Sequence, residues 1–338
     1  MWKITTGARL HCGLLETAPG QPFRFGGIGM MVAQPEIIAV LKRDPLSGRT
    51  ETSGSIAKVR VDKQISLAEA LSNYQHPQGG RIEILQLPPQ HAGFGTGTQL
   101  ACAVSSLIKC QWMHTAQNGT TPFDQQKTVQ LNRVWESTTE LLQWSGRGKR
   151  STIGAFGFLG GGLIVDHGHN ELGYGQLGNH LRSIGPLAVL LATPKQNVAV
   201  TGGEEDRLMA QVALKPNPHR QEMWELISSS IVPAAQQQNW ELFGEALHEY
   251  GKLAGLQFAA IQGGIYRNDQ VAELVARMHR LGLGGVCQSS WGPTVFGLSA
   301  DFELAARIAK QLSAFYGEDV QVQLTELLNH GATIELLE

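Results

Sequence analysis

The 338-residue chain has little that would suit it to a membrane or to nucleic acid. Lys and Arg number 27 against 29 Asp and Glu, so the net charge is −2 and the basic excess of a nucleic-acid or membrane-surface binder is absent. The longest apolar runs, 156–165 and 186–192, are far shorter than the ~18 residues of a membrane span. The first six residues lack the apolar core of a signal peptide. We therefore expect a cytoplasmic protein without nucleic-acid or membrane partners.

Cysteine is also scarce, with four residues in the chain. Cys12, Cys102, Cys110 and Cys287 form no CxxC pair, and Cys102 and Cys110 fall within a helical pattern. Zinc sites and disulfide frameworks have characteristic cysteine spacings that these four do not show. The cysteine content therefore argues against both and fits a reducing compartment.

Glycine is in excess, at 40 of 338 positions, or about 12% against a usual ~7%. The glycines are clustered, which excludes the regular repeat of collagen and is typical of backbone that comes close to a ligand. At about 100–200 residues per domain, the length predicts two domains. The polar, glycine-containing segment 167–185 offers a boundary, so we expect one domain over residues 1–180 and another over 181–338.

The pattern of apolar residues predicts an α+β chain. Short strands are expected at 37–41, 81–87, 163–165, 186–193, 294–298 and 320–324. Helices are expected at 98–114, 123–144, 208–214, 221–232, 240–256, 270–281 and 301–315.

The most informative segment is residues 88–100 (PPQHAGFGTGTQL), between a predicted strand and a long predicted helix. Free backbone N–H groups and the helix dipole favour an anion at such a place. Gly93, Gly95 and Gly97 let the backbone approach a phosphate closely. Thr96 and Thr98 can cap the helix or bond phosphate oxygens. The alternative is a merely tight turn, which needs fewer than three glycines.

Two other patterns carry less weight, and a third is absent. Residues 173–178 (GYGQLG) match the GxGxxG dinucleotide fingerprint, but that motif must open a helix directly after a strand. Gly185 and Pro186 would end any such helix, so we interpret the match as a loop. No GxxxxGK[ST] phosphate loop occurs in the sequence. Residues 166–169 (DHGH) could bind a metal, although a solvated turn is the commoner interpretation.

The glycine-rich segment resembles the second motif of the GHMP kinase superfamily, in which a loop that opens a helix holds phosphate. Residues 288–296 (QSSWGPTVF) resemble the C-terminal motif of the same superfamily, a loop of small residues beside the first. The typical kinase loop reads GLGSSA, whereas residues 93–98 read GFGTGT. This difference favours a branch of the superfamily that is not a kinase.

That branch is the β-ribofuranosylaminobenzene 5′-phosphate synthase family, which the chain resembles in four blocks. Besides residues 93–100 and the Trp-Gly-Pro motif, they are residues 8–16 (ARLHCGLLE), continued by 23–29 (FRFGGIG), and residues 146–154 (GRGKRSTIG). Four blocks in the right order span most of the chain, which makes the resemblance fairly specific.

The resemblance implies a GHMP-kinase-like two-domain fold, with an N-terminal α/β domain that carries the phosphate loop and a C-terminal ferredoxin-like domain. It also implies a transferase that joins phosphoribosyl pyrophosphate to 4-aminobenzoate or 4-hydroxybenzoate. Such a reaction forms a C-riboside with loss of CO₂ and pyrophosphate, an early step toward tetrahydromethanopterin.

Phosphoribosyl pyrophosphate carries two separated anions, and the sequence offers two places for them. The loop from Gly93 to Thr98 is the first, with Ser290 and Gly292 expected beside it. Arg147, Lys149 and Arg150, three cations within a glycine-flanked stretch, are the second. The alternative for these cations is a solvated basic turn.

Departure of pyrophosphate builds positive charge on the ribose C1, which a carboxylate would stabilise. Glu16 is the carboxylate nearest the first matched block, and Arg24 could pair with the benzoate carboxylate or a phosphate. Both could instead be ordinary surface residues. His11 could act as an acid–base group, or be a satisfied residue at a sheet edge. The acceptor's own amino or hydroxyl group activates its ring, so the protein mainly positions the reactants.

The remaining expectations concern the surroundings of the reaction. Mg²⁺ on the pyrophosphate is chemically expected, with no ligands named. His91 could contact phosphate, and Trp291 could form a wall against the aromatic substrate. A homodimer is the default for a soluble enzyme. Two other functions stay open: an ATP-dependent GHMP small-molecule kinase, and a non-catalytic protein that binds a phosphorylated metabolite.

Overall fold

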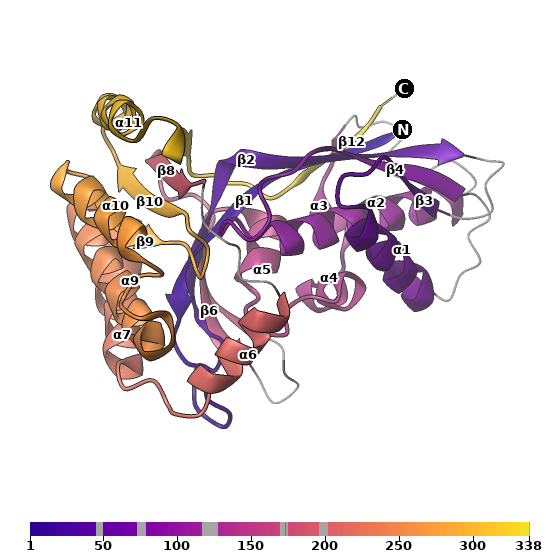
Figure 1. Ribbon diagram of the computed structural model, residues 1–338. Coiled ribbons are helices and arrows are strands. Elements are labelled where there is room, and N and C mark those ends of the chain that lie inside the picture. The colour runs from indigo at the N-terminus through magenta and orange to yellow at the C-terminus, as the bar shows by residue number, and fades with distance from the viewer. Residues whose placement is uncertain are drawn as a thin grey trace.

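The computed structural model describes residues 1–44, 50–72, 79–116, 128–169, 173, 175–195 and 202–337. Two sheets lie side by side, each with its own helices (Figure 1).

The first sheet has eight strands, with the longest two, β1 and β2, at its centre. Its strands are β1 (Trp2–Leu14), β2 (Gly27–Asp44), β3 (Thr50–Ser53), β4 (Gly79–Gln86), β5 (Thr128–Val129), β6 (Leu163–His169), β7 (Gly175–Leu181) and β12 (Thr333–Leu336). The order is β3-β4-β2-β1-β12-β5, and β6 extends the sheet by pairing with the start of β2 and with β7.

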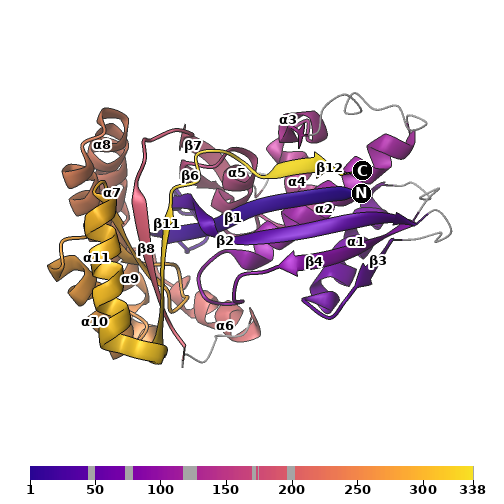
Figure 2. The ribbon, with the colours of Figure 1, turned by 90° about the horizontal axis from the view of Figure 1, so that it is seen from above.

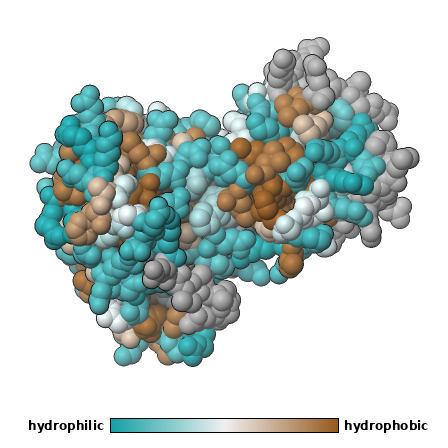
Figure 3. Space-filling model, turned by 45° about the horizontal axis from the view of Figure 1, so that its top comes forward, coloured by the Kyte–Doolittle hydropathy of each residue, from teal (hydrophilic) through white to brown (hydrophobic). Residues whose placement is uncertain are grey.

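Helices cover one face of this sheet and leave the other face open (Figure 1). They are α1 (Lys58–Ser72), α2 (Thr96–Ala116), α3 (Leu131–Val134), α4 (Thr138–Ser145) and α5 (Ile153–Gly160). On the side where the strands lie uncovered, the molecular surface carries an apolar area (Figure 3). Both termini lie at this sheet, because β12 pairs with the start of β1 (Figure 2).

The second sheet has four antiparallel strands in the order β11-β8-β10-β9. Its strands are β8 (Ala188–Pro194), β9 (Gly284–Gln288), β10 (Val295–Ser299) and β11 (Val320–Glu326). The helices of this half are α6 (Gly202–Val212), α7 (Arg220–Leu226), the π-helical turn η1 (Ile227–Ile231), α8 (Val232–Gln237), α9 (Trp240–Gln262), α10 (Asp269–Arg280), α11 (Phe302–Tyr316) and the 3₁₀ turn η2 (Gly317–Asp319). The chain order βα-ββ-αβ with this strand order is ferredoxin-like. The predicted α+β class is confirmed.

One hydrophobic core joins the two halves where β1 leaves the first sheet. Leu10 and Met30, from the central strands, belong to the same buried cluster as Phe243 and Tyr250 of α9. The Tyr250 hydroxyl donates to the Gly13 carbonyl at 2.9 Å. Each of these large side chains, when fully buried, contributes about 1.5–3 kcal/mol to folding. The end of β1 is therefore fixed against both sheets, which matters because it enters the site described below.

Most of the expected elements are confirmed, and three expectations are wrong. A single helix over 123–144 does not form: residues 117–127 lie outside the described part, and two short helices follow them. The second, α4, starts afresh because Ser137 accepts from the backbone N–H of Glu140, a new N-cap. Residues 166–169 are not a solvated turn but part of β6, and the last four residues of the GxGxxG match, 175–178, lie in strand β7 instead of a loop.

The division of the chain near residue 180 stays a proposal, to which the sheets add one detail. The first sheet's β7 ends at Leu181 and the second sheet's β8 starts at Ala188. The C-terminal strand β12, however, returns to the first sheet and pairs with β1 and β5.

The long strand β1 was not predicted from the sequence, because its mixed polar residues hide the apolar alternation.

Candidate active site

Three segments that are distant in sequence meet at the end of β1. The N–H of His11 donates to Ser289 Oγ at 3.1 Å, and the Ser289 hydroxyl donates to the Gly93 carbonyl at 2.7 Å. The N–H of Ser290 donates to the His11 carbonyl at 2.8 Å. These bonds connect β1, the glycine-rich loop (residues 88–95) and the Ser-Trp-Gly loop (residues 289–292).

The two loops touch through glycines. A Cβ on Gly292 would lie 2.3 Å from the backbone nitrogen of Gly93, and a Cβ on Gly93 would lie 2.7 Å from the Ser289 carbonyl oxygen. Gly93 also has a φ of 100°, which other residues adopt with strain. The contact requires both glycines, and it places the Ser-Trp-Gly loop beside the first loop as the resemblance implied.

The glycine-rich loop ends at the start of α2, whose first residue is Thr96. No acidic residue stands in the first turn of this helix, so the positive end of its dipole is not compensated there. The Thr96 hydroxyl donates to the Pro89 carbonyl at 3.3 Å and thus holds the loop closed. Thr98 lines the hollow in front of the helix. This is the arrangement that binds phosphate groups at helix N-termini.

A cleft lies in front of this helix start, and we call it the cationic cleft. It consists of two hollows of about 500 and 760 Å³ that share walls, including Thr98, Gly146 and Ser290. Seven cationic side chains line it: Arg9, Arg24, Arg60, Lys63, Arg147, Lys149 and Arg150. No Asp or Glu is among the described residues that line either hollow.

The arginines converge on the helix start. A Cβ on Gly97 would have Arg60 Nη1 at 3.6 Å and the two terminal nitrogens of Arg147 at 3.7 Å. Burial, and then the neighbouring Arg60 charge, lowers the pKa of Arg147. Placing like charges together at a helix N-terminus is unfavourable unless an anion joins them. The cleft is therefore built for a ligand with more than one negative group.

Buried N–H groups without partners also face this region. Arg24 Nε, His11 Nε2 and Trp291 Nε1 are buried, and none has a hydrogen-bond partner among the residues that the structure describes. All three residues line the cleft. A buried donor without an acceptor costs about 1–3 kcal/mol, so an ordered water or a ligand oxygen at these positions stabilises the site.

His11 is neutral in this setting. Burial, and then the nearby Arg9 charge, lowers the pKa of His11 well below its usual value. The Gly13 N–H donates to His11 Nδ1 at 3.1 Å, so in the neutral ring the hydrogen is on Nε2. His11 therefore presents an N–H donor, not a base, toward the cleft.

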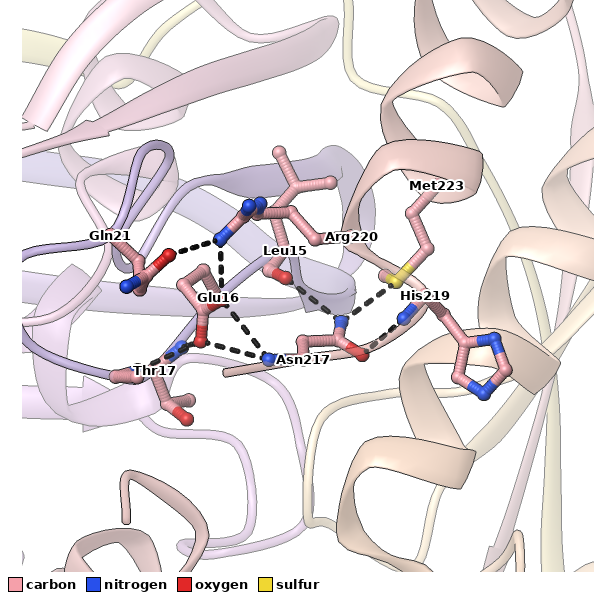
Figure 4. Close-up of polar contacts among 9 residues, drawn as sticks. Leu15, Glu16, Thr17, Gln21, Asn217, His219, Arg220 and Met223 are labelled. Atoms are coloured by element: carbon pink, nitrogen blue, oxygen red, sulfur yellow. Dashed lines mark hydrogen bonds and ion pairs between the residues drawn. The ribbon is translucent and has the colours of Figure 1, made fainter. Parts of the chain in front are cut away.

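Glu16 lies away from the cleft, in a fully buried network (Figure 4). Its carboxylate accepts from the N–H groups of Thr17 and Ala18, each at 2.8 Å, and from Asn217 N at 3.1 Å. Arg220 Nη1 forms an ion pair with Glu16 Oε2 at 3.0 Å. Glu16 thus ties the turn after β1 to the segment that precedes α7. These contacts favour a positioning role, and its predicted role at the ribose C1 stays a prediction.

The structure brings together most of the side chains that the sequence analysis selected. The cleft is lined by His11, Arg24, Gly93, Gly95, Thr96, Gly97, Thr98, Arg147, Lys149, Arg150, Ser290 and Gly292. His91 and Trp291 line it as well.

Three further cations, Arg9, Arg60 and Lys63, line the cleft and were not predicted from the sequence. Arg9 stands in a matched block, so it could have been found there. Arg60 and Lys63 look like ordinary surface cations of helix α1, and only the packing of α1 beside α2 brings them to the cleft.

The DHGH segment does not form a metal site in the part of the chain described here. Asp166 is buried, and its carboxylate accepts from the Thr152 N–H at 2.8 Å, the Thr152 hydroxyl at 2.6 Å and the Gly168 N–H at 2.9 Å. Burial raises the pKa of Asp166 against the effect of these bonds. Asp166 therefore fixes Thr152, the last residue of the basic stretch 146–152. Among the described residues, no group of three His, Cys, Asp or Glu side chains could hold a metal ion.

Comparison with known proteins is consistent with this fold and site. Residues 231–318 match the family described as GHMP kinases C terminal. Beta-ribofuranosylphenol 5'-phosphate synthase of Methanocaldococcus jannaschii is 26% identical, over 98% of this chain and 99% of that protein. The enzyme of the same name from Methanothermobacter thermautotrophicus is 24% identical, over 88% of each chain. The chain is a homologue of these synthases.

Solved structures confirm the fold of this synthase homologue. Leishmania major mevalonate kinase in complex with R-mevalonate has a TM-score of 0.65 at 13% identity, over 96% of this chain and 95% of that one. A mevalonate diphosphate decarboxylase from Staphylococcus aureus has a TM-score of 0.64 at 14% identity, over 100% and 99% of the two chains. The structure of MDDEF in complex with MVAPP, AMPPCP and magnesium has a TM-score of 0.60 at 14% identity, over 100% of this chain and 98% of that one. The GHMP-kinase-like two-domain fold is thereby confirmed.

We predict that Arg147→Ala weakens the binding of inorganic pyrophosphate at least tenfold. The reason is that a hydrogen bond from a charged donor contributes about 1.5–3 kcal/mol. Titration calorimetry measures the affinity, and Arg307→Ala, which removes an exposed cation from α11, serves as the matched control. Unchanged affinity in Arg147→Ala would show that this arginine does not hold the anion.

We predict that Glu16→Gln lowers the free energy of unfolding by about 1.5–3 kcal/mol, because it replaces a charged acceptor of several buried donors. Urea unfolding measures the loss. Glu222→Gln is the control, since Glu222 faces His219 at 3.6 Å with an exposed side chain. A Glu16→Gln variant that keeps wild-type stability but loses turnover would show that Glu16 acts in the reaction and not in folding.

We predict that His11 makes the protein less stable as pH falls below about 6.5. In that range the unfolded chain takes up a proton that the folded, neutral His11 does not, and stability falls by about 1.4 kcal/mol per pH unit. Urea unfolding at several pH values, compared between wild type and His11→Asn, isolates this contribution. If the two proteins show the same pH dependence, His11 is not held neutral by the fold.

Proposed function

We propose that the chain is a ribosyltransferase that joins phosphoribosyl pyrophosphate to a para-substituted benzoate, with loss of CO₂ and pyrophosphate, in the route to tetrahydromethanopterin. The observation that carries the proposal is the cationic cleft, whose seven cations and helix start meet without a carboxylate among the described lining residues. Nearly full-length relatives that share one synthase name support it.

The two anions of phosphoribosyl pyrophosphate match the two hollows of the cleft. We place one at the start of α2, where Arg60 and Arg147 converge on Gly97. The other lies in the hollow that Arg24 and Lys149 line. Fixing both ends of the sugar phosphate holds the ribose between them, which is the orientation effect that a two-substrate reaction needs.

The reaction balances without an added oxidant or reductant. The C1–O bond of the ribose breaks, and its electron pair leaves with pyrophosphate, which the cleft arginines and lysines stabilise. The ring carbon that bears the carboxylate forms the new C–C bond to C1. The bond from that carbon to the carboxylate then breaks, its electron pair restores the aromatic ring, and CO₂ departs.

The acceptor is 4-hydroxybenzoate rather than 4-aminobenzoate in this proposal. The relatives are named for a ribofuranosylphenol product, and a phenol results when the para substituent is a hydroxyl. Both acids activate the ring in the same way, so the two are compared directly in the test below.

Magnesium stays an expectation for this chain. A solved structure of the same fold holds magnesium together with AMPPCP. The described residues of the cationic cleft offer no carboxylate ligand, so the protein's own side chains there do not fit a resident Mg²⁺. A Mg²⁺ ion would enter the cationic cleft bound to the pyrophosphate oxygens of the substrate, and no step above depends on it.

A cytoplasmic location and a homodimer complete the proposal. Among the residues that the structure describes, no helix is long and apolar enough to cross a membrane. All four cysteines are buried and free, which is compatible with a reducing compartment.

The test is ¹⁴CO₂ release from carboxyl-labelled 4-hydroxybenzoate or 4-aminobenzoate with phosphoribosyl pyrophosphate and Mg²⁺, with and without ATP. We expect release that requires phosphoribosyl pyrophosphate, does not require ATP and is faster with 4-hydroxybenzoate. Absence of release from either acid would contradict the proposal. ATP consumption with a small alcohol or acid would then support the kinase alternative, and binding without any turnover would support a non-catalytic protein.

A further inference from the structure

A second, narrower hollow opens from the cationic cleft and has the opposite character. It lies between the end of β1, helix α9 and the Ser-Trp-Gly loop, and it shares His11, Leu14 and Ser290 with the cleft. No Asp, Glu, Lys or Arg is among its described lining residues. We call it the uncharged pocket. Its volume is about 50 Å³, against about 500 and 760 Å³ for the two hollows of the cleft, so it takes one end of a ligand whose other end lies in the cleft.

The walls of the uncharged pocket suit a flat ring. Phe258 of α9 and Trp291 meet edge to face, with ring centroids 5.0 Å apart. Tyr266 lines the same space, and burial raises its pKa to about 12, so its hydroxyl stays protonated. Aromatic side chains with small residues between them, here Gly251 and Ala254, form the usual lining of a pocket for an aromatic ligand.

Two buried donors stand where the pocket meets the cleft. His11 Nε2 and Trp291 Nε1 are both buried without a partner, and both residues line the pocket and the cleft. Arg267 Nη1 donates to the Trp291 carbonyl at 2.8 Å and fixes this part of the loop. Two fixed N–H groups without a described partner favour a ligand that brings acceptor oxygens to that point.

The other end of the pocket offers an acceptor. Gln262 Nε2 donates to the carbonyl oxygens of Gly264 and Ile265, at 2.9 and 2.8 Å. Because the amide nitrogen must face those carbonyls, the orientation of the amide is determined and its Oε1 is left to accept. Gln262 lines the pocket but not the cleft. It can therefore accept a hydrogen bond from a donor at the far end of a ligand.

We propose that the uncharged pocket binds the aromatic acid, with its carboxylate at His11 and Trp291 and its para substituent donating to Gln262. This inference rests on the proposed function and adds the acceptor subsite to it. The orientation follows from the reaction, since the new bond forms at the carbon that bears the carboxylate. That carbon has to face the ribose in the cleft, which leaves the para group on the side of Gln262, a residue that lines the pocket and not the cleft.

The pocket then determines which acids are accepted. A hydroxyl or an amino group can each donate to Gln262 Oε1, whereas fluorine of nearly the same size cannot. A site built around a hydrogen bond discriminates strongly against an analogue that lacks the group, because its polar atom is left unpaired.

The first test uses the wild-type protein and needs no turnover. Equilibrium dialysis compares ¹⁴C-labelled 4-hydroxybenzoate with unlabelled 4-aminobenzoate and 4-fluorobenzoate as competitors. We expect 4-aminobenzoate to compete within a few-fold of 4-hydroxybenzoate and 4-fluorobenzoate to bind at least tenfold more weakly. Equal affinity for 4-fluorobenzoate would overturn the assignment of Gln262, and no binding of any of the acids would overturn the pocket.

The second test separates the pocket from the cleft. Trp291→Phe keeps a ring and removes the N–H, so we expect KM for 4-hydroxybenzoate to rise about tenfold while KM for phosphoribosyl pyrophosphate stays within twofold. Trp240→Phe is the matched control, since Trp240 packs on Phe243 at the start of α9 and does not line the pocket.

The two failures are distinguishable. A rise in KM for phosphoribosyl pyrophosphate in Trp291→Phe, with KM for the acid unchanged, would overturn the pocket and leave the function intact. A wild-type protein that releases no CO₂ would overturn the function, whereas the dialysis result would still decide whether an aromatic acid binds.

Discussion

The repulsion among the cations of the cleft is the constraint on which the rest of this structure depends. Arg60 and Arg147 both approach Gly97 at the positive end of helix α2, and no described carboxylate lines the cleft to compensate them. Two like charges several ångströms apart repel by ~1–4 kcal/mol near a protein surface. This repulsion has to be offset either by stabilising contacts elsewhere in the fold or by a bound anion. The cost is the physical basis of selectivity for a substrate with several negative groups, because such a ligand gains most from entering.

The offsetting contacts are hydrogen bonds and an ion pair of residues that do not line the cleft. Asp166 holds the start of α5 through both the N–H and the hydroxyl of Thr152, and Ser289 joins β1 to the glycine-rich loop. Glu16 likewise fixes the segment before α7, because its carboxylate accepts from the N–H of Asn217 and forms an ion pair with Arg220. Asp166 and Glu16 each bond backbone N–H groups and one side chain, and neither lines the cleft. The negative charge needed to hold the site together is thus kept out of contact with the phosphates.

The sequence alone predicts the parts of this arrangement that are local. Clustered glycines before a helix predict the phosphate loop, and three cations within residues 147–150 predict a second anion site, because backbone and charge within a few residues act together whatever the fold. Arg60 and Lys63 could not be found in this way, since their helix α1 looks ordinary until it packs against α2. The partners of Glu16 are equally remote, because Asn217 and Arg220 lie about 200 residues away in the chain. A buried carboxylate and a catalytic one look alike in a sequence, and only its neighbours distinguish them.

The end of β1 separates two environments that this chemistry needs at the same time. On one side lies the cationic cleft, which stabilises a departing pyrophosphate; on the other lies the uncharged pocket, in which a carboxylate is poorly solvated. A carboxylate that is about to leave as CO₂ loses its charge, so surroundings that stabilise the charge strongly would oppose the step. His11 stands at the boundary and is kept neutral by burial and by Arg9. In the binding mode proposed above, the neutral N–H of His11 orients the carboxylate without the strong attraction that an imidazolium would exert on it.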